Sequence, residues 1–162
     1  MIKKLKVLSL FSGIGAPEKA LTNLGIDYEL VGFSEIDKYA IKSYCAIHNV
    51  NENLNLGDIS KIRIDDIPEC DLLIFGFPCQ DISVVGKQKG IVKGETRSGL
   101  LYECEKIIEN KKPKYLLMEN VKNLVSKKFK PQFDEWLKYL ESLGYTSYWK
   151  VLNSQNYGIP QN

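Results

Sequence analysis

Short apolar runs that indicate buried strands alternate along this chain with stretches that have the periodicity of amphipathic helices. We expect strands at residues 5–10, 28–34, 53–56, 72–75, 115–118 and 145–152. Helices are expected at residues 16–24, 37–48, 99–110 and 132–143. Strands that alternate with helices predict an α/β fold, a mostly parallel and doubly wound sheet with helices on both faces. The chain has 162 residues, enough for one domain with a core.

The composition is that of an ordinary globular protein, with 44% hydrophobic and 26% charged residues. The net charge of +2 provides no overall basic field, so a nucleic-acid partner is neither required nor excluded. The lysines at 127, 128 and 130 form a basic cluster that we interpret as a solvated face. No apolar run is long enough to span a membrane, and the N-terminus lacks a signal-peptide core. We therefore expect a cytoplasmic protein.

Glycine and acidic residues follow three consecutive predicted strands. The run Phe11-Ser12-Gly13-Ile14-Gly15 comes after the first strand and is either a nucleotide-binding turn or simply a tight connection. Glu35 stands about 20 residues further on, where an acidic residue binds ribose hydroxyls in dinucleotide folds. The pair Asp58-Ile59 follows the third strand, as Ile36 follows Glu35. Together these residues predict a pocket for an adenosine-like ligand, whereas each acid alone would favour helix capping or plain solvation.

Cys79 lies at the end of the predicted strand 72–75, where ligands bind and chemistry occurs in open α/β sheets. The preceding Pro78 fixes the local backbone and removes a hydrogen-bond donor. The other cysteines (Cys45, Cys70 and Cys104) are interpreted as small buried hydrophobic residues, and no C-x-x-C pair indicates a zinc site or a disulfide framework. The only histidine, His48, is expected on the surface at a helix end, far from any strand end. A Cys–His hydrolase is therefore disfavoured.

Glu119 is the next acid–base candidate, at the end of the predicted strand 115–118. This strand and the strand before Cys79 are neighbours in a doubly wound sheet, so the two side chains should face one cleft. A thiol and a carboxyl without a histidine suit attack on an electron-poor ring whose nitrogen must be protonated. They suit peptide hydrolysis poorly.

These residues lie in stretches that resemble the DNA (cytosine-5)-methyltransferase family. The matching stretches occur in the family's order and cover almost the whole chain: LSLFSGIGAPEKAL, GFSEIDKYA, GDISKI, LLIFGFPCQDISVVGKQKG, RSGLLYE, PKYLLMENVKNL and LNSQNYGIPQN. The resemblance implies a Rossmann-like methyltransferase fold that uses S-adenosylmethionine and no metal. Cys79 would add to C6 of a cytosine flipped out of double-stranded DNA, Glu119 would protonate the base, and C5 would accept the methyl group.

The resemblance also assigns residues to the two ligands. The cofactor would be bound by Phe11, Ser12, Gly13, Gly15, Glu35, Ile36, Asp58, Ile59, Pro78 and Leu100. The DNA and the target base would be contacted by Gln80, Ser83, Lys87, Lys89, Asn120 and Val121. For the two lysines, a solvated loop is an equally good interpretation.

In the family, the motif that ends this chain is followed by another strand and a target-recognition domain. Residues 1–162 are thus expected to form an incomplete cofactor-binding and catalytic domain, with the edge of strand 115–118 open and strand 145–152 without its neighbour. We expect little activity from this chain alone, and completion by further sequence or by a second chain. A non-catalytic binding module and an RNA cytosine-5 methyltransferase are the alternatives.

Overall fold

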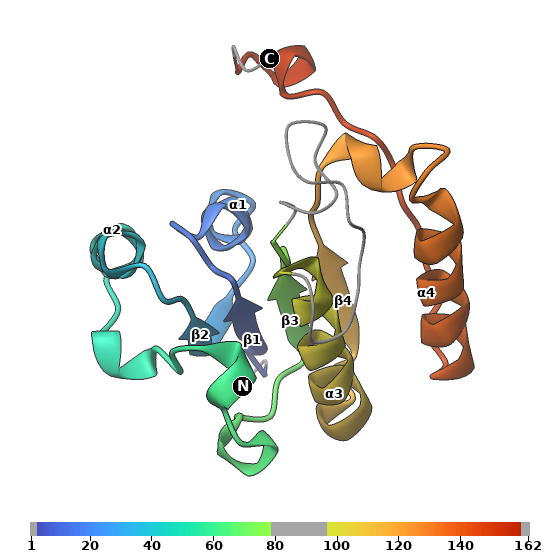
Figure 1. Cartoon of the computed structure of the whole chain (residues 1–162). Helices are drawn as coiled ribbons and strands as arrows, with labels where there is room; N and C mark the ends of the chain where they lie inside the picture. The colour runs from blue at the N-terminus through green and yellow to red at the C-terminus, as the bar shows by residue number, and fades with distance from the viewer. Residues whose placement is uncertain (1–2, 79–96, 160–162) are drawn as a thin grey trace. The chain divides into compact units, whose positions relative to one another are not determined.

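The computed structural model describes residues 3–78 and 97–159, and its sheet has four parallel strands in the order β2-β1-β3-β4 (Figure 1). The strands are β1 (Leu5–Leu10), β2 (Tyr28–Ser34), β3 (Leu72–Phe75) and β4 (Tyr115–Met118). Each neighbouring pair is parallel, and β2 carries one irregularity opposite Val7 and Leu8. The predicted parallel α/β sheet is therefore confirmed, and β4 stands at its edge as expected.

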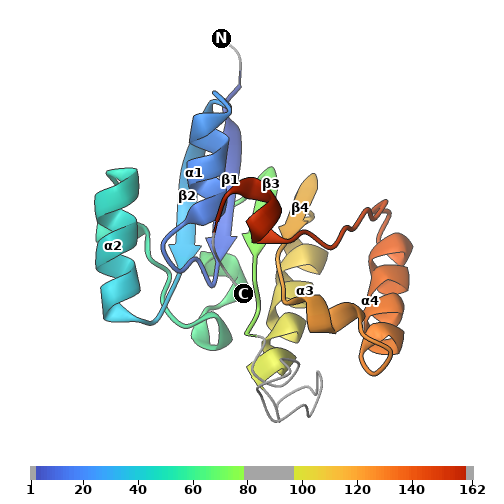
Figure 2. The ribbon, with the colours of Figure 1, turned by 90° about the horizontal axis from the view of Figure 1, so that it is seen from above.

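Both faces of the central strands β1 and β3 are largely buried, as expected for parallel strands with helical connections, whereas the residues of the edge strand β4 are half-buried or exposed. Val7, Leu72 and Ile74 pack with Leu21 of helix α1 (Ala16–Asn23). The alternate residues of β1 and β3 are also buried, on the face that carries helix α3 (Leu101–Lys111). Figures 1 and 2 show α1 and α3 on opposite sides of the sheet. Helix α2 (Lys38–His48) adds a second cluster, in which Ile41 and Tyr44 pack on Phe33 of β2.

The helices begin where their local sequence directs them to. Pro17 lies in the first turn of α1, where a backbone N–H would have no acceptor within the helix, so the lack of an N–H costs no hydrogen bond. The Asp37 side chain accepts hydrogen bonds from the backbone N–H groups of Tyr39 and Ala40 and thus caps α2 as predicted. Helix α3 begins two residues later than predicted because residues 97–100 form a 3-10 turn.

The predicted third strand, 53–56, is wrong. Residues 52–54 form a 3-10 turn, in which the Asn51 side chain accepts a hydrogen bond from the N–H of Asn53, and only the isolated bridge between Phe33 and Asn55 remains of the pairing. Backbone pairing continues for one bond, from the N–H of Leu56 to the carbonyl of Phe33. The asparagine side chains thus replace the hydrogen bonds of a ladder with local ones.

The predicted last strand, 145–152, is also wrong, because residues 145–153 have no regular secondary structure. They belong to the second of two compact units, 1–120 and 121–162. In the second unit, Trp149 lies edge-on to Phe133 of helix α4 (Lys130–Ser142), with ring centroids 5.9 Å apart. A strand needs a ladder partner for its backbone groups. Within the described residues of this unit, no strand pairs with the segment, so its β-branched and aromatic residues do not suffice to make it a strand.

Candidate functional site

The glycine turn, residues 11–15, connects β1 to α1 through a backbone that mostly lies in the left-handed region. The φ angles are 53° at Phe11, 54° at Gly13 and 78° at Gly15. The turn is closed by a hydrogen bond from the N–H of Gly15 to the carbonyl of Ser12, at 2.9 Å. The side-chain oxygen of Ser12 is buried with no hydrogen-bond partner among the described residues. The turn therefore presents a polar atom in need of a partner, next to the N-terminus of α1.

Glu35 folds its carboxylate back onto the glycine turn. Its Oε2 accepts a hydrogen bond from the N–H of Gly13 at 2.9 Å, and its Oε1 accepts from the N–H groups of Ile36 and Asp37. A carboxylate offers about four acceptor positions, so Oε2 retains capacity for a ligand hydroxyl. The capping interpretation and the ligand interpretation of Glu35 are therefore compatible in this geometry.

Asn55 joins the end of β2 to the segment that follows. Its Oδ1 accepts from the backbone N–H groups of Glu35 and Gly57, and its Nδ2 donates to the carbonyl of Glu35. Ser34 adds a hydrogen bond to the carbonyl of Gly57 at 2.6 Å. Sequence reasoning missed Asn55, although an asparagine two residues before the Gly57-Asp58 pair was a usable turn signal.

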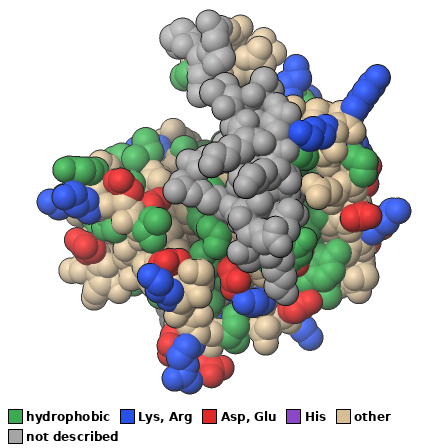
Figure 3. All heavy atoms as spheres, in the orientation of Figure 1, with side chains coloured by type: hydrophobic (Ala, Val, Ile, Leu, Met, Phe, Trp, Pro, Cys, Tyr) green, Lys and Arg blue, Asp and Glu red, His purple; other side chains and the backbone are tan. Residues whose placement is uncertain are grey.

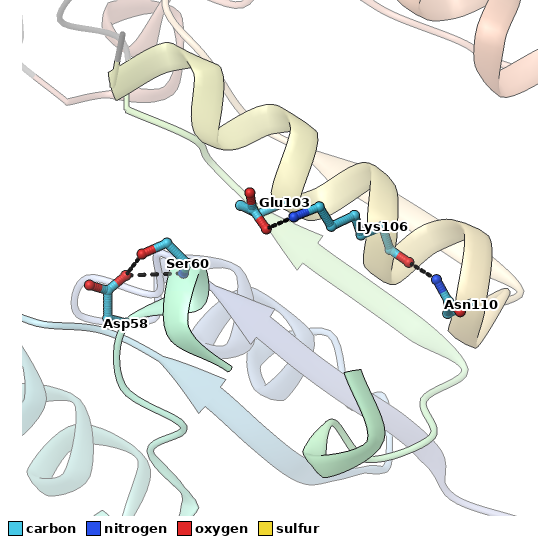
Figure 4. Close-up of polar contacts among 5 residues, drawn as sticks. All are labelled: Asp58, Ser60, Glu103, Lys106 and Asn110. Carbon is cyan, nitrogen blue, oxygen red and sulfur yellow. Dashed lines mark hydrogen bonds and ion pairs between the residues drawn. The ribbon is translucent and has the colours of Figure 1, made fainter. Parts of the chain in front are cut away.

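Asp58 caps its own 3-10 turn, as Figure 4 shows. Its Oδ1 accepts from both the N–H and the hydroxyl of Ser60, and Lys61 lies 3.4 Å from Oδ2. The Ser60 hydroxyl is the largest influence that lowers the pKa of the Asp58 carboxyl, so this carboxylate stays ionised. The same figure shows the polar side chains of α3 bonded along the helix, with Lys106 to Glu103 at 2.7 Å.

The apolar neighbours of the two acids differ in exposure. Ile36 is 74% exposed, whereas Ile59 is buried in the core at 5%. Only Ile36 thus presents a large apolar surface on which a flat ring could lie.

The ends of β3 and β4 are held together by two hydrogen bonds. The N–H of Glu119 donates to the carbonyl of Phe75 at 3.2 Å, and the Nδ2 of Asn120 donates to the carbonyl of Phe77 at 3.1 Å. The Glu119 carboxylate lies over Gly76, where a Cβ would stand 3.5 Å from its Oε2. The exposed carboxyl of Glu119 thus lies beside the segment that leads through Pro78 to position 79.

The proposed nucleophile and four candidate DNA contacts lie outside the described residues; these are Cys79, Gln80, Ser83, Lys87 and Lys89. Of the remaining candidates, Pro78 and Leu100 are half-buried at the two ends of that gap. Val121 begins the second unit. The predicted pairing of Cys79 with Glu119 therefore stays a prediction.

The three other cysteines are poor nucleophiles. Cys70 and Cys104 are buried and Cys45 is half-buried. Burial raises the pKa of the Cys70 thiol to about 12, and it also raises the pKa values of Cys104 and Cys45.

The expectation for His48 was wrong in one respect. This residue ends α2, but its Nε2 lies 3.0 Å from the carbonyl oxygen of Ile14, and so it lies against the turn that follows β1. A histidine at a helix end carries no sequence signal for such a long-range contact.

On the face shown in Figure 3, basic and acidic side chains are interspersed, in keeping with the small net charge. No described helix has the length and apolar character needed to cross a membrane. Within residues 3–78 and 97–159, no three His, Cys, Asp or Glu side chains are grouped so as to hold a metal ion.

A parallel sheet with a glycine turn after its first strand and acidic side chains at the next strand ends is the arrangement of nucleotide-binding α/β domains. The sequence model of the family described as C-5 cytosine-specific DNA methylase matches residues 5–162. The chain therefore belongs to this family, and its fold is the Rossmann-like fold of S-adenosylmethionine-dependent methyltransferases.

Named relatives agree with this assignment. The chain is 49% identical over 159 residues to the orphan methyltransferase M.SPRI of Bacillus phage SPR, covering 98% of the chain and 36% of the relative. It is 41% identical to the type II methyltransferase M2.ScrFI of Lactococcus lactis subsp. cremoris, covering 98% of the chain and 58% of the relative. The crystal structure of the S. pombe Dnmt2 methyltransferase superposes with a TM-score of 0.74 at 26% identity, covering 97% of the chain and 45% of that structure. The chain thus spans less than two thirds of each relative.

Proposed function

We propose that this chain carries the cofactor-binding and catalytic residues of an enzyme that transfers a methyl group from S-adenosylmethionine to C5 of cytosine in DNA. Family membership supports the reaction class. The joined ends of β3 and β4 support the assignment of residues, since they hold the Glu119 carboxyl beside the segment that leads to Cys79.

The described residues fit the cofactor. The glycine turn supplies a close backbone approach and the buried hydroxyl of Ser12, and Glu35 retains an acceptor position for a ribose hydroxyl. Ile36 offers an exposed apolar surface for the adenine ring. Asp58 offers an ionised carboxylate next to Gly57, whose backbone is tied to the end of β2 by Asn55 and Ser34. When bound, S-adenosylmethionine supplies an electrophilic methyl group.

The Cys79 thiolate forms a bond to C6 of the flipped-out cytosine, and the electron pair of the C5–C6 double bond moves into the ring. Glu119 delivers a proton to N3, which stabilises the adduct. C5 would then accept the methyl group of bound S-adenosylmethionine, whose sulfur would keep the electron pair of the broken S–CH₃ bond. A solvent base takes the C5 proton, the C5–C6 double bond re-forms as the Cys79 thiolate leaves, and the N3 proton returns to Glu119. Cys79 is favoured as nucleophile because burial raises the pKa of each other thiol.

The DNA side of the reaction is assigned to Gln80, Ser83, Lys87, Lys89, Asn120 and Val121. Asn120 has a second role, since its side-chain amide already joins the two strand ends. Because the chain spans about a third to three fifths of its relatives, we propose that further sequence or a second chain reads the DNA, and that these 162 residues alone methylate weakly or not at all.

Covalent trapping tests this proposal directly. The chain, alone and with the C-terminal part of a relative supplied as a second chain, is mixed with S-adenosylmethionine and duplex DNA that contains 5-fluorocytosine. The fluorine at C5 cannot be eliminated, so the Cys79 adduct should persist and appear as a shifted band in a denaturing gel. Cys79→Ser should abolish the band, Glu119→Gln should slow its formation, and the matched control Cys45→Ser should leave it unchanged.

Three outcomes would contradict the proposal in different ways. The absence of an adduct in both settings favours a non-catalytic binding module. An adduct with fluorinated RNA but not with DNA favours an RNA methyltransferase. Robust sequence-specific methylation by the 162 residues alone would refute the dependence on a further part.

A further inference from the structure

Side chains from α1 and α2 form a connected chain beneath the glycine turn. The hydroxyl of Tyr44 donates to the Oε1 of Glu18 at 2.9 Å, and both residues are buried, at 0% and 1% exposure. The Tyr44 ring stacks on Phe33 of β2 with centroids 4.3 Å apart, and it also contacts the His48 ring, whose centroid lies 4.6 Å away. Contact therefore runs without interruption from the sheet to His48.

His48 ends this chain at the backbone of the turn. Its Nε2 lies 3.0 Å from the carbonyl oxygen of Ile14, and because a carbonyl only accepts, the contact requires an N–H at Nε2. The same peptide unit donates its N–H, that of Gly15, to the carbonyl of Ser12. Both polar atoms of the Ile14–Gly15 peptide are thus bonded, and the peptide is held against rotation.

Gly15 explains how the rings come so close. A Cβ at this position would stand 2.2 Å from the Nε2 of His48 and 2.7 Å from the Cε2 of Tyr44. The turn therefore rests directly on the two rings, and no side chain separates it from them.

The residues that flank α2 hold the turn at two points. Glu35, just before the cap of α2, accepts from the N–H of Gly13, and His48, the last residue of α2, bonds the carbonyl of Ile14. The polar groups of two consecutive residues are thus fixed from the two ends of one helix. A helix that only packed on the sheet would not need either contact.

We propose that His48 and Tyr44 are positioning residues that hold the glycine turn, through α2, in the conformation that binds S-adenosylmethionine. This inference rests on the proposed function in that the turn belongs to the cofactor site. It assigns a role to the single histidine and to the buried Glu18–Tyr44 pair, which the chemistry at Cys79 and Glu119 does not use.

The test compares variants of the whole chain by two independent measurements. Hydrogen exchange of the Gly13 and Gly15 amides reports on the turn without cofactor, and calorimetric titration with S-adenosylmethionine reports on binding. His48→Ala should speed exchange at the turn and weaken binding, each by about tenfold, as expected for one lost hydrogen bond. His48→Gln, whose amide can still donate to the Ile14 carbonyl, should recover most of both. Ile47→Ala, on the exposed side of the same helix, is the matched control and should change neither.

Tyr44→Phe keeps the ring packing and removes only the bond to Glu18, so it should change both readouts in the same direction but less. If the His48→Ala variant does not fold, the same two measurements on the His48→Gln and Tyr44→Phe variants decide the proposal. Faster exchange without weaker binding, or no effect of His48→Ala beyond that of Ile47→Ala, would overturn the proposal. If the unmodified chain does not bind S-adenosylmethionine at all, the proposed function fails, whereas exchange at the turn still decides whether His48 holds it.

Discussion

The side chain of Asn55 forms two hydrogen bonds with the backbone of Glu35: its Oδ1 accepts from the Glu35 N–H and its Nδ2 donates to the Glu35 carbonyl, each at 3.1 Å. One amide side chain thereby continues the pairing between β2 and residues 55–56, where the backbone contributes only the bridge at Phe33. It also determines where the Glu35 carboxylate stands relative to the glycine turn.

We predict that Asn55→Ala lowers the free energy of unfolding by about 2 kcal/mol, because it leaves the N–H groups of Glu35 and Gly57 without their acceptor. Urea titration followed by circular dichroism measures the change. Asn53→Ala, at an exposed asparagine in the 3-10 turn that precedes Asn55, is the matched control and should be nearly neutral. Equal effects of the two substitutions would contradict the role given to Asn55.

Two glycines of the turn should respond very differently to alanine. Both have positive φ, but a Cβ at Gly13 would meet nothing within 4 Å, whereas a Cβ at Gly15 would collide with His48 and Tyr44. Gly13→Ala should therefore cost about 1 kcal/mol of stability from backbone strain alone. Gly15→Ala should cost about 2–4 kcal/mol because overpacking is added. Thermal unfolding of the two variants provides the comparison. Similar melting temperatures would contradict the prediction, because they would show that the His48 and Tyr44 rings move aside at little cost.

Stability should fall in alkaline solution partly through Tyr44. Burial, aided by the Glu18 carboxylate, raises the pKa of Tyr44 well above its ordinary value of about 10. The folded state therefore keeps this proton while the unfolded state loses it, so the stabilisation is complete below about pH 10 and declines as the pH rises further. The slope from this group approaches about 1.4 kcal/mol per pH unit. Tyr44→Phe should be less stable at pH 8 but should show a shallower decline between pH 10 and 11. Parallel pH profiles would contradict the assignment.

The buried thiols should resist alkylation in the folded protein. With its pKa near 12, Cys70 is almost entirely protonated at pH 8, and Cys104 is fully buried with its pKa also raised. Brief treatment with iodoacetamide followed by peptide mass mapping should leave both unlabelled, and addition of urea should make both reactive. Rapid labelling of Cys104 without denaturant would show that the core around α3 opens readily.

The edge strand β4 should promote self-association of this chain. Tyr115 and Leu117 are 49% and 46% exposed on a strand with one unpaired side in the described sheet. Leu117→Lys should reduce concentration-dependent light scattering, because a charge on an edge strand disfavours strand addition. Ile47→Lys places the same charge on an equally exposed helical site and should have little effect. If both variants scatter alike, net charge and not the edge is responsible.

Sequence patterns predicted the elements that are stabilised by continuous apolar runs. The strands β1, β2 and β3 and the capped helix α2 belong to this group, because burial or a local cap decides them; β4 was predicted from its short apolar run, although its residues are half-buried or exposed. The segment 145–152 has strand-forming residues but finds no ladder partner in its unit, and pairing is a property of two segments. The contacts of Asn55 and His48 were missed for the same reason, since each joins residues that only the fold brings together. The positions after the strands could be predicted because parallel strands end at one edge of a sheet.

The absence of a side chain at Gly15 also has a consequence for sequence change within the family. A methyl group at position 15 would occupy space that the His48 ring already fills. A relative that carries alanine at the first position should carry a smaller residue than histidine at the second, so that the two positions vary as a pair. Correlated substitution at positions 15 and 48, which lie on different elements, would then reveal the contact between the turn and α2 from sequences alone.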